Sequence, residues 1–310
     1  MRISPARYRL ITAVALGLLI VIVVSGAAVR LTGSGLGCDD WPNCNDQRLI
    51  DVSSGHAAIE QVNRLFTGLV AFAVMAAVLG SLWRTPRRRD LTWLSVGLVA
   101  GVLAQIALGG ITVLVDLHPL AVQGHMLVSM VLVATAVVLV RRAGEPDDGV
   151  RVPAVSTTTR RLVWAIATVT ALAIIAGTVV TGAGPHAGDE DVQRFGIAIS
   201  SAARIHGTTV LLAIGLAVGL ALHLQRVPAD RQVLQGTVSS WIFIGLLQGA
   251  IGYIQYFNGV PELLVGLHVA GATALWSMTV WLVLATSTAV PAVTGDGSMA
   301  TTGLVPSRST

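Results

Sequence analysis

The chain has 310 residues, of which 54% are hydrophobic and 12% are charged, and its mean hydropathy is +0.75. These values exclude a soluble globular domain and predict an integral membrane protein. The net charge of +4 comes from arginine clusters between apolar runs. Arginine clusters in these positions set the orientation of the helices in a membrane. Nucleic-acid binding is not needed to explain these clusters.

Eight apolar runs are long enough to cross the hydrocarbon core as helices, which takes about 20 residues each. They begin near Leu10, Ala57, Leu91, Leu120, Leu162, Ala198, Leu234 and Leu263, and the last ends near Thr286. The first run could also be a cleaved signal peptide, because Ser25-Gly26-Ala27 resembles a small-residue cleavage site. We favour a retained helix, since cleavage would destroy the match between the two halves of the chain.

The runs of basic residues between these apolar runs all fall on one side of the expected membrane. They are Arg2, Arg7, Arg9, Arg84, Arg87, Arg88, Arg89, Arg141, Arg142, Arg151, Arg160, Arg161, Arg226 and Arg231. The loops on the opposite side are acidic. By the positive-inside rule, we expect a multi-pass protein of a prokaryotic cell membrane with both termini in the cytoplasm and the first loop outside.

The second half of the sequence resembles the first. One constant interval relates four residue pairs, which are Asn63 and His206, Gln105 and Gln248, Gly109 and Gly252, and His125 and His268. Four helices per half is an even number, so we expect an all-α fold of two parallel four-helix-bundle repeats related by a pseudo-two-fold axis along the membrane normal.

The expected organisation has five segments. They are a cytoplasmic N-terminus (1–9), an N-terminal four-helix half (10–140), a cytoplasmic linker (141–161), a C-terminal four-helix half (162–286) and a disordered cytoplasmic tail (287–310).

Asn63, His125, His206 and His268 each fall one to two turns into a helix that starts from the outer side, roughly 8 to 12 Å deep. A neutral imidazole can enter the membrane and still offer a nitrogen lone pair to a metal. Two imidazoles without carboxylate or thiolate partners suit haem better than zinc. The repeat therefore predicts two haem or metal positions, one of them altered by Asn63. The alternative is that these histidines are hydrogen-bonded packing residues.

Glu60 precedes Asn63 by less than one helical turn, so both lie on one face. A carboxyl group at that depth must be neutral, paired or catalytic. Arg30, Arg64 and Arg204 are candidates to pair with it or to bind the carboxylate groups of a cofactor. Simple snorkelling of each arginine to the interface is the alternative.

The two cysteines, Cys38 and Cys44, lie in the first outer loop. Facing an oxidising compartment, such a pair can form a disulfide. A structural disulfide and a redox-active one that exchanges with a thiol partner both remain open.

The chain resembles a haem A synthase of the bacterial eight-helix type over about residues 8–286. The resemblance rests on the segment Gly26-Ala-Ala-Val-Arg-Leu-Thr-Gly-Ser-Gly-Leu-Gly-Cys-Asp-Asp-Trp-Pro-Asn-Cys44, on Glu60 and Arg64, and on Gln123-Gly-His125, Arg204-Ile-His206 and Gly266-Leu-His268. It implies an enzyme that oxidises a methyl substituent of haem O to a formyl group, giving haem A for terminal oxidases.

The resemblance also implies roles for individual residues. His206 and His268 would hold a haem b cofactor, and His125 would hold the haem O substrate in the N-terminal half. Glu60 matches the family's functional carboxylate, and Cys38 and Cys44 match its outer-loop pair.

Asn63 departs from the family pattern, because the family has a histidine there. Our hypothesis is that His125 alone holds haem O five-coordinate and that the side facing Asn63 and Glu60 is open, with Glu60 moving protons and Asn63 donating a hydrogen bond. Replacement of the missing ligand by His56 would need a local rearrangement, and we rank it last.

Expected partners are the lipid bilayer, a haem O synthase that hands over the substrate, and an electron acceptor or thiol–disulfide partner; a homo-oligomer also fits. The main alternative function is a non-enzymatic di-haem electron-transfer cytochrome. A transporter fits less well, because the helices lack the breaks that it would need.

Overall fold

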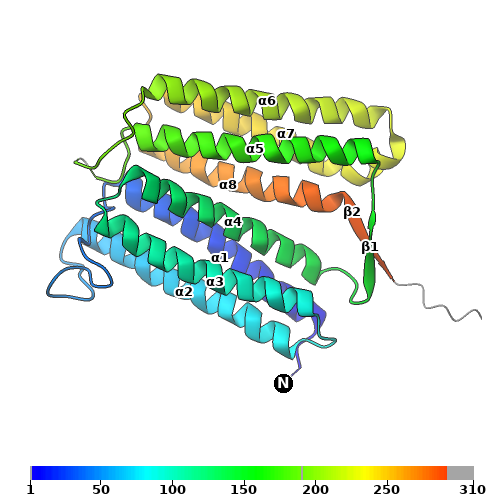
Figure 1. Ribbon diagram of the computed structural model, residues 1–310, viewed down its shortest axis with the longest axis horizontal. Helices are drawn as coiled ribbons and strands as arrows, with labels where there is room; N and C mark the ends of the chain where they lie inside the picture. The colour runs from blue at the N-terminus through cyan, green and yellow to red at the C-terminus, as the bar shows by residue number, and fades with distance from the viewer. Residues whose placement is uncertain (1, 190, 292–310) are drawn as a thin grey trace, which may run out of the picture.

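The computed structural model describes residues 2–189 and 191–291, and its architecture is almost entirely helical (Figure 1). The helices are α1 (Pro5–Leu31), α2 (Gly55–Trp83), α3 (Arg89–Leu114), α4 (Pro119–Ala143), α5 (Thr157–Ala183), α6 (Ile199–Gln225), α7 (Pro228–Phe257) and α8 (Glu262–Ala285). All 8 are long and apolar enough to cross a membrane. The prediction of an eight-span all-α membrane protein is thus confirmed.

Several helices begin earlier than their apolar runs, because polar capping residues start them. Ser4 accepts a hydrogen bond from the Arg7 amide at the start of α1, and Ser156 does the same for Thr159 in α5. Pro228 occupies the first turn of α7, where a missing N–H costs nothing. These first turns are too polar to be found by hydropathy alone.

The helices form two groups of four. In each group the neighbours follow chain order and close on themselves: α1 contacts α2 and α4, α3 contacts α2 and α4, and the same order holds for α5 to α8. Figure 1 shows the first group on one side of the molecule and the second on the other. Each group has its own core, with Tyr8 and Leu98 fully buried in the first and Trp241 almost fully buried in the second.

Helices α4 and α8 form the contact between the two groups, together with α1 and α5. A small third core lies there, centred on Val23, Met130 and Val133. The indole of Trp276 on α8 donates a hydrogen bond to the Met130 carbonyl on α4 (2.9 Å). The groups are therefore joined by apolar packing and by hydrogen bonds between helices, since Gln123 on α4 also donates to the Thr178 hydroxyl on α5 (2.8 Å).

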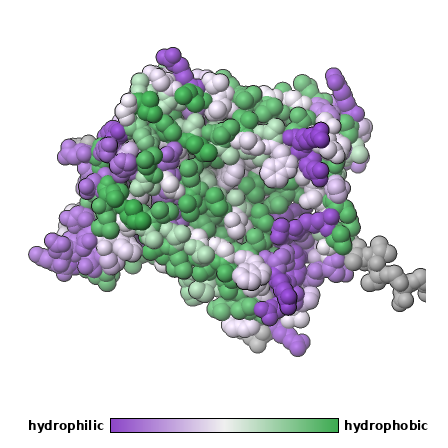
Figure 2. Space-filling view, viewed as in Figure 1, coloured by the Kyte–Doolittle hydropathy of each residue, from purple (hydrophilic) through white to green (hydrophobic). Residues whose placement is uncertain are grey.

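The face of the bundle shown in Figure 2 is apolar across its middle and hydrophilic toward its two ends. Large side chains such as Phe72, Phe243 and Leu263 are at least 70% exposed. Because a soluble protein would bury such residues, this surface fits contact with lipid. We call the end that carries the Cys38–Cys44 loop the cysteine end, and the end where the described chain begins and finishes the terminal end.

Two short strands lie at the terminal end. Strand β1 (Gly149–Pro153) pairs antiparallel with β2 (Ser287–Pro291), with Arg151 opposite Ala289. Residues 287–291 were expected in a disordered tail, so for them the prediction was wrong. The linker offers an unpaired strand, and pairing satisfies the backbone groups of both segments. The rest of the predicted tail, 292–310, lies outside the described residues.

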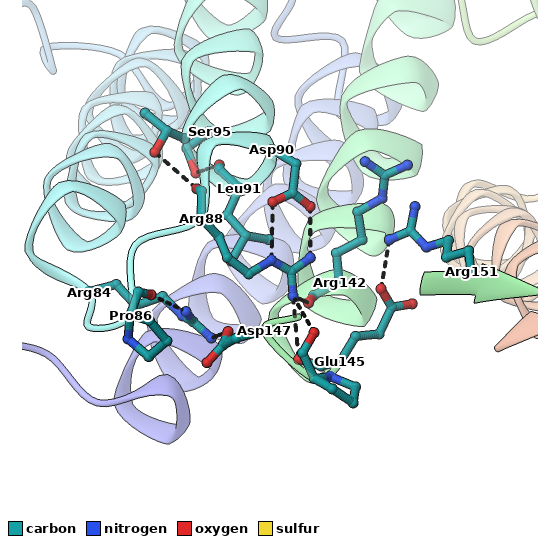
Figure 3. Close-up of polar contacts among 12 residues, drawn as sticks. Arg84, Pro86, Arg88, Asp90, Leu91, Ser95, Arg142, Glu145, Asp147 and Arg151 are labelled. Carbon is teal, nitrogen blue, oxygen red and sulfur yellow. Dashed lines mark hydrogen bonds and ion pairs between the residues drawn. The ribbon is translucent and has the colours of Figure 1, made fainter. Parts of the chain in front are cut away.

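Three ion pairs lie around the linker and the ends of α2 and α3, and the Arg84–Asp147 pair joins the linker to the end of α2 (Figure 3). Arg84, which is 2% exposed, bonds to Asp147 (2.5 Å); Arg88 bonds to Asp90 (2.7 Å), and Arg151 to Glu145 (2.6 Å). These groups surround a surface cavity of about 340 Å³. The Arg84 pair is the most buried of the three.

We predict that Asp147→Ala destabilises the protein by about 1–3 kcal/mol, because it leaves the buried Arg84 guanidinium without its counter-ion. The thermal unfolding midpoint in detergent measures the effect. Asp148→Ala is the matched control, since Asp148 is exposed and makes no side-chain bond with the described residues. Equal midpoints for the two variants would contradict the prediction.

Candidate functional site

His206 on α6 and His268 on α8 face each other near the cysteine end. Their ring centroids are 6.1 Å apart and the rings are nearly perpendicular. A metal–nitrogen bond is about 2.0 Å long. One metal ion between the two rings is therefore compatible with the observed separation.

Each histidine ring lies directly against a glycine on the preceding helix. A Cβ atom placed on Gly177 would lie 3.1 Å from Cε1 of His206, and one on Gly252 would lie 3.3 Å from Cε1 of His268. In the first half, Gly109 stands 3.5 Å from Cε1 of His125 by the same measure. The rings occupy the space of the missing side chains. The sequence interval had paired Gly109 with Gly252, but nothing in it had indicated these contacts.

The ring nitrogens differ in their partners. His206 donates from Nδ1 to the Ala173 carbonyl (2.9 Å), which leaves Nε2 as the nitrogen free to bind a metal. Nδ1 of His125 and of His268 is buried without a hydrogen-bond partner. No cluster of three or more histidine, cysteine or acidic side chains occurs within residues 2–189 and 191–291. The donor set is therefore one of paired imidazoles, which fits haem better than a zinc site.

The corresponding position of the first half is built differently. The backbone of His125 on α4 is bonded to Gln105 of α3, whose Nε2 donates to the His125 carbonyl (3.0 Å) and to the Ser129 hydroxyl. Asn63 on α2 donates from Nδ2 to the hydroxyl of Ser25 on α1 (2.9 Å). Where the second half has two imidazoles, the first has one imidazole and an amide.

Glu60 lies at the centre of the contacts that hold the cysteine loop to α2. Its Oε2 accepts the Cys38 amide (2.8 Å), and its Oε1 accepts Nη2 and Nε of Arg64 (2.7 and 3.0 Å). Arg64 also donates to the carbonyls of Asp40 and Asn43. Of the three arginines considered from the sequence, the structure pairs Arg64 with Glu60.

Cys38 and Cys44 form a disulfide, and both are almost completely buried. The loop that they close sits tightly on the start of α2, since a Cβ atom on Gly37 would lie 2.4 Å from the His56 carbonyl oxygen. The His56 ring contacts the Ser34 hydroxyl through Nδ1 (3.0 Å). This contact holds the His56 ring, at the start of α2, against the loop.

Arg30 lines a crevice between the two halves with Leu117, Val122 and Gln193. Arg204 is exposed on α6 and forms no ion pair with the residues that the structure describes. His118, His186 and His223 lie at helix ends or in a loop, where they bond to Leu120, Val260 and Thr159. None of these three joins the paired histidines.

The comparison with protein families decides the classification of the chain. The family described as COX15-CtaA, cytochrome oxidase assembly protein, matches residues 9–58 and 49–188, which together make up more than half of the chain. The chain belongs to this family. The matched region includes α1 to α5, with Glu60, Asn63, His125 and the disulfide loop.

Individual relatives agree with the family. A heme A synthase of Bacillus pumilus is 29% identical over 135 residues, 42% of this chain and 43% of that protein. A heme A synthase of Shewanella oneidensis is 29% identical over 140 residues, 40% and 42% of the two chains. A protoheme IX farnesyltransferase of Chloroflexus aurantiacus is 31% identical over 97 residues, 31% of this chain and 16% of that protein. The matched segment spans less than half of the length of each relative.

We predict that Glu60→Ala speeds reduction of the Cys38–Cys44 disulfide by a soluble thiol about tenfold or more. The loop loses its hydrogen bond to a charged acceptor, which contributes about 1.5–3 kcal/mol. Thiol alkylation after timed reduction gives the rate. Glu60→Gln, which keeps an acceptor for the Cys38 amide, should fall between Ala and the parent. Val62→Ala changes an exposed neighbour and should leave the rate unchanged; unchanged reduction in Glu60→Ala would contradict the role given to Glu60.

Proposed function

We propose that the protein is a haem A synthase that oxidises a methyl substituent of haem O to a formyl group. Membership of the COX15-CtaA family and the relatives named heme A synthase support the reaction class. The observation that carries the proposal is the pair His206 and His268, each ring resting in the space left by a glycine. No other residue pair among those described offers two imidazoles at this separation.

In this proposal, His206 and His268 bind haem b through one nitrogen each. The hydrogen bond from His206 Nδ1 to the Ala173 carbonyl fixes the tautomer that presents Nε2 and holds the plane of the ring. Gly177 and Gly252 keep the helix backbones close to the rings. When bound, haem b supplies one-electron transfer.

Haem O would occupy the first half, with His125 as its imidazole ligand. Gln105 fixes the backbone of α4 at His125, and the disulfide loop held by Glu60 and Arg64 covers the cysteine end of α2. Both Glu60 oxygens are engaged, so proton transfer by Glu60 requires the carboxylate to release Arg64 or the Cys38 amide. Arg30, at the crevice between the halves, remains a candidate for a haem propionate, and Arg204 is a second one for haem b.

The reaction places demands on partners. If the oxygen atom comes from water, converting a methyl to a formyl group releases four electrons and four protons, so an electron acceptor is required. By the positive-inside rule, the arginine-rich terminal end faces the cytoplasm and the disulfide loop faces outward. The match to part of a protoheme IX farnesyltransferase supports direct handover of substrate from a haem O synthase.

The second candidate function is a di-haem electron-transfer cytochrome. Such a protein would place its haems near opposite membrane surfaces to move electrons across. Here Asn63, His125, His206 and His268 all lie within the first third of helices that start at the cysteine end. This shared depth favours the synthase.

The reaction is tested by co-expressing the chain with a haem O source and separating the extracted haems by chromatography. Haem A should form with the parent chain and disappear in His125→Ala and Glu60→Ala. His223→Gln, at the terminal end, should retain it. If haem b is the sole product in every sample, the synthase proposal is wrong.

The haem b site is tested with two glycine substitutions. Gly177→Ala should lower the haem b content of the purified protein severalfold, because its Cβ presses on the His206 ring. Gly207→Ala is the matched control on α6: it borders His206 in sequence, and its Cβ meets no atom within 4 Å. The pyridine haemochrome spectrum, normalised to protein, measures the content. Equal haem content in the two variants would contradict the site.

A further inference from the structure

We propose that Ser25 and Asn63 form a polar pair that keeps one side of the first haem position open to a small protic ligand. Ser25 is the positioning residue and Asn63 is the residue that faces the ligand. The inference rests on the proposed function to the extent that the first half binds a haem through His125. The ligand class that the pair fits is water or a peroxide.

The hydrogen bonds fix the direction in which the Asn63 amide points. The Ser25 hydroxyl donates to the Ile22 carbonyl (3.3 Å), so its oxygen is the acceptor for Nδ2 of Asn63 (2.9 Å). If the amide turned over, the Ser25 hydroxyl would have to give up its bond to the Ile22 carbonyl in order to donate to Oδ1. Oδ1 of Asn63 accepts no hydrogen bond from any residue in the described ranges. Oδ1 of Asn63 is therefore available as an acceptor, and a ligand that donates a hydrogen bond would satisfy it.

The space beside the pair differs from that in the second half. Gly26 follows Ser25 in the last two turns of α1, and Gly177 lies in the last two turns of α5. Gly177 is filled by the His206 ring, whereas a Cβ on Gly26 meets no atom within 4 Å. The space beside Gly26 is therefore open, whereas the space beside Gly177 holds an imidazole ring.

The side chains of Ser25 and Asn63 are not of the types that bind haem iron. Protein side chains that bind haem iron are histidine, cysteine, methionine and tyrosine, and an amide is not among them. Polar side chains at this depth are costly unless they have partners. Asn63 obtains one partner from Ser25, and its free oxygen can accept a hydrogen bond from a protic ligand. The pair therefore fits an open coordination side better than a closed one.

The first test uses the spin state of the full-length purified protein loaded with ferric haem. The parent should give a high-spin signal from the first half beside the low-spin signal of the His206–His268 site. Asn63→His should convert the high-spin signal to low-spin and abolish carbon monoxide binding after reduction, and His125→Ala should remove the high-spin signal. The low-spin signal of the other half reports correct folding in each variant. A parent protein that is entirely low-spin, or one that binds no carbon monoxide, would overturn the proposal.

The second test isolates the positioning role of Ser25 by the infrared stretch of bound carbon monoxide. In Ser25→Ala the amide is free to turn its NH₂ toward the ligand, and a donor there lowers the stretching frequency. Ser25→Thr keeps the hydroxyl and should give the parent frequency. Unchanged frequencies in both variants would overturn the role of Ser25.

Haem A formation is scored separately in the same preparations. Haem A with an entirely low-spin parent would reject the open side and leave the synthase proposal intact. Carbon monoxide binding that depends on His125, without haem A formation, would support the open side and reject the synthase proposal.

Discussion

Inside a hydrocarbon layer, every polar group must find its partner within the protein, and this constraint governs the structure. Within a helix, the backbone N–H and C=O groups form hydrogen bonds with one another. Polar side chains must bond across helices, and several do so at the positions that join one helix to the next. Asn63 bonds to Ser25, His206 to Ala173, and Trp276 to Met130. These bonds fix the rotation of the helices about their axes, which apolar packing against lipid alone would leave weakly determined.

The two halves use the same order of helix neighbours but different chemistry at the same depth. In the second half, two glycines each make room for one imidazole ring; in the first, a serine hydroxyl and an amide take the place of one imidazole. Because the surrounding helices are arranged alike, the difference comes from a few side chains. The proposed division of labour between an electron-carrying half and a substrate-binding half therefore needs no difference in the order of the helices.

Hydropathy was enough to predict the eight helices, because a run of about 20 apolar residues has few alternatives to a membrane span. The cysteine pair was identified as a candidate disulfide, and it forms. Three arginines were left open from the sequence as partners of Glu60, although Arg64 is four residues away on α2 and helix geometry places the two side by side. The glycines behind the histidines were also missed, because the contact joins two helices. Strand β2 was assigned to a disordered tail because its partner lies far away in the chain.

The cysteine end and the terminal end are secured by different means. At the cysteine end a buried carboxylate binds the backbone of a disulfide loop, and at the terminal end a strand pair and the partly exposed Arg88–Asp90 and Arg151–Glu145 ion pairs stabilise the segments. The first arrangement is largely shielded from water and salt, whereas the second is open to both. Changes in ionic strength should therefore loosen the terminal end first.

The pairing of β1 with β2 brings the chain entering α5 beside the chain leaving α8. A four-helix unit whose entry and exit lie together can be copied, joined in tandem or reordered without threading a new segment through the bilayer. The strand pair thus marks where one half could have been appended to the other as a finished module. It also offers a natural junction for dividing the protein into two separately produced fragments.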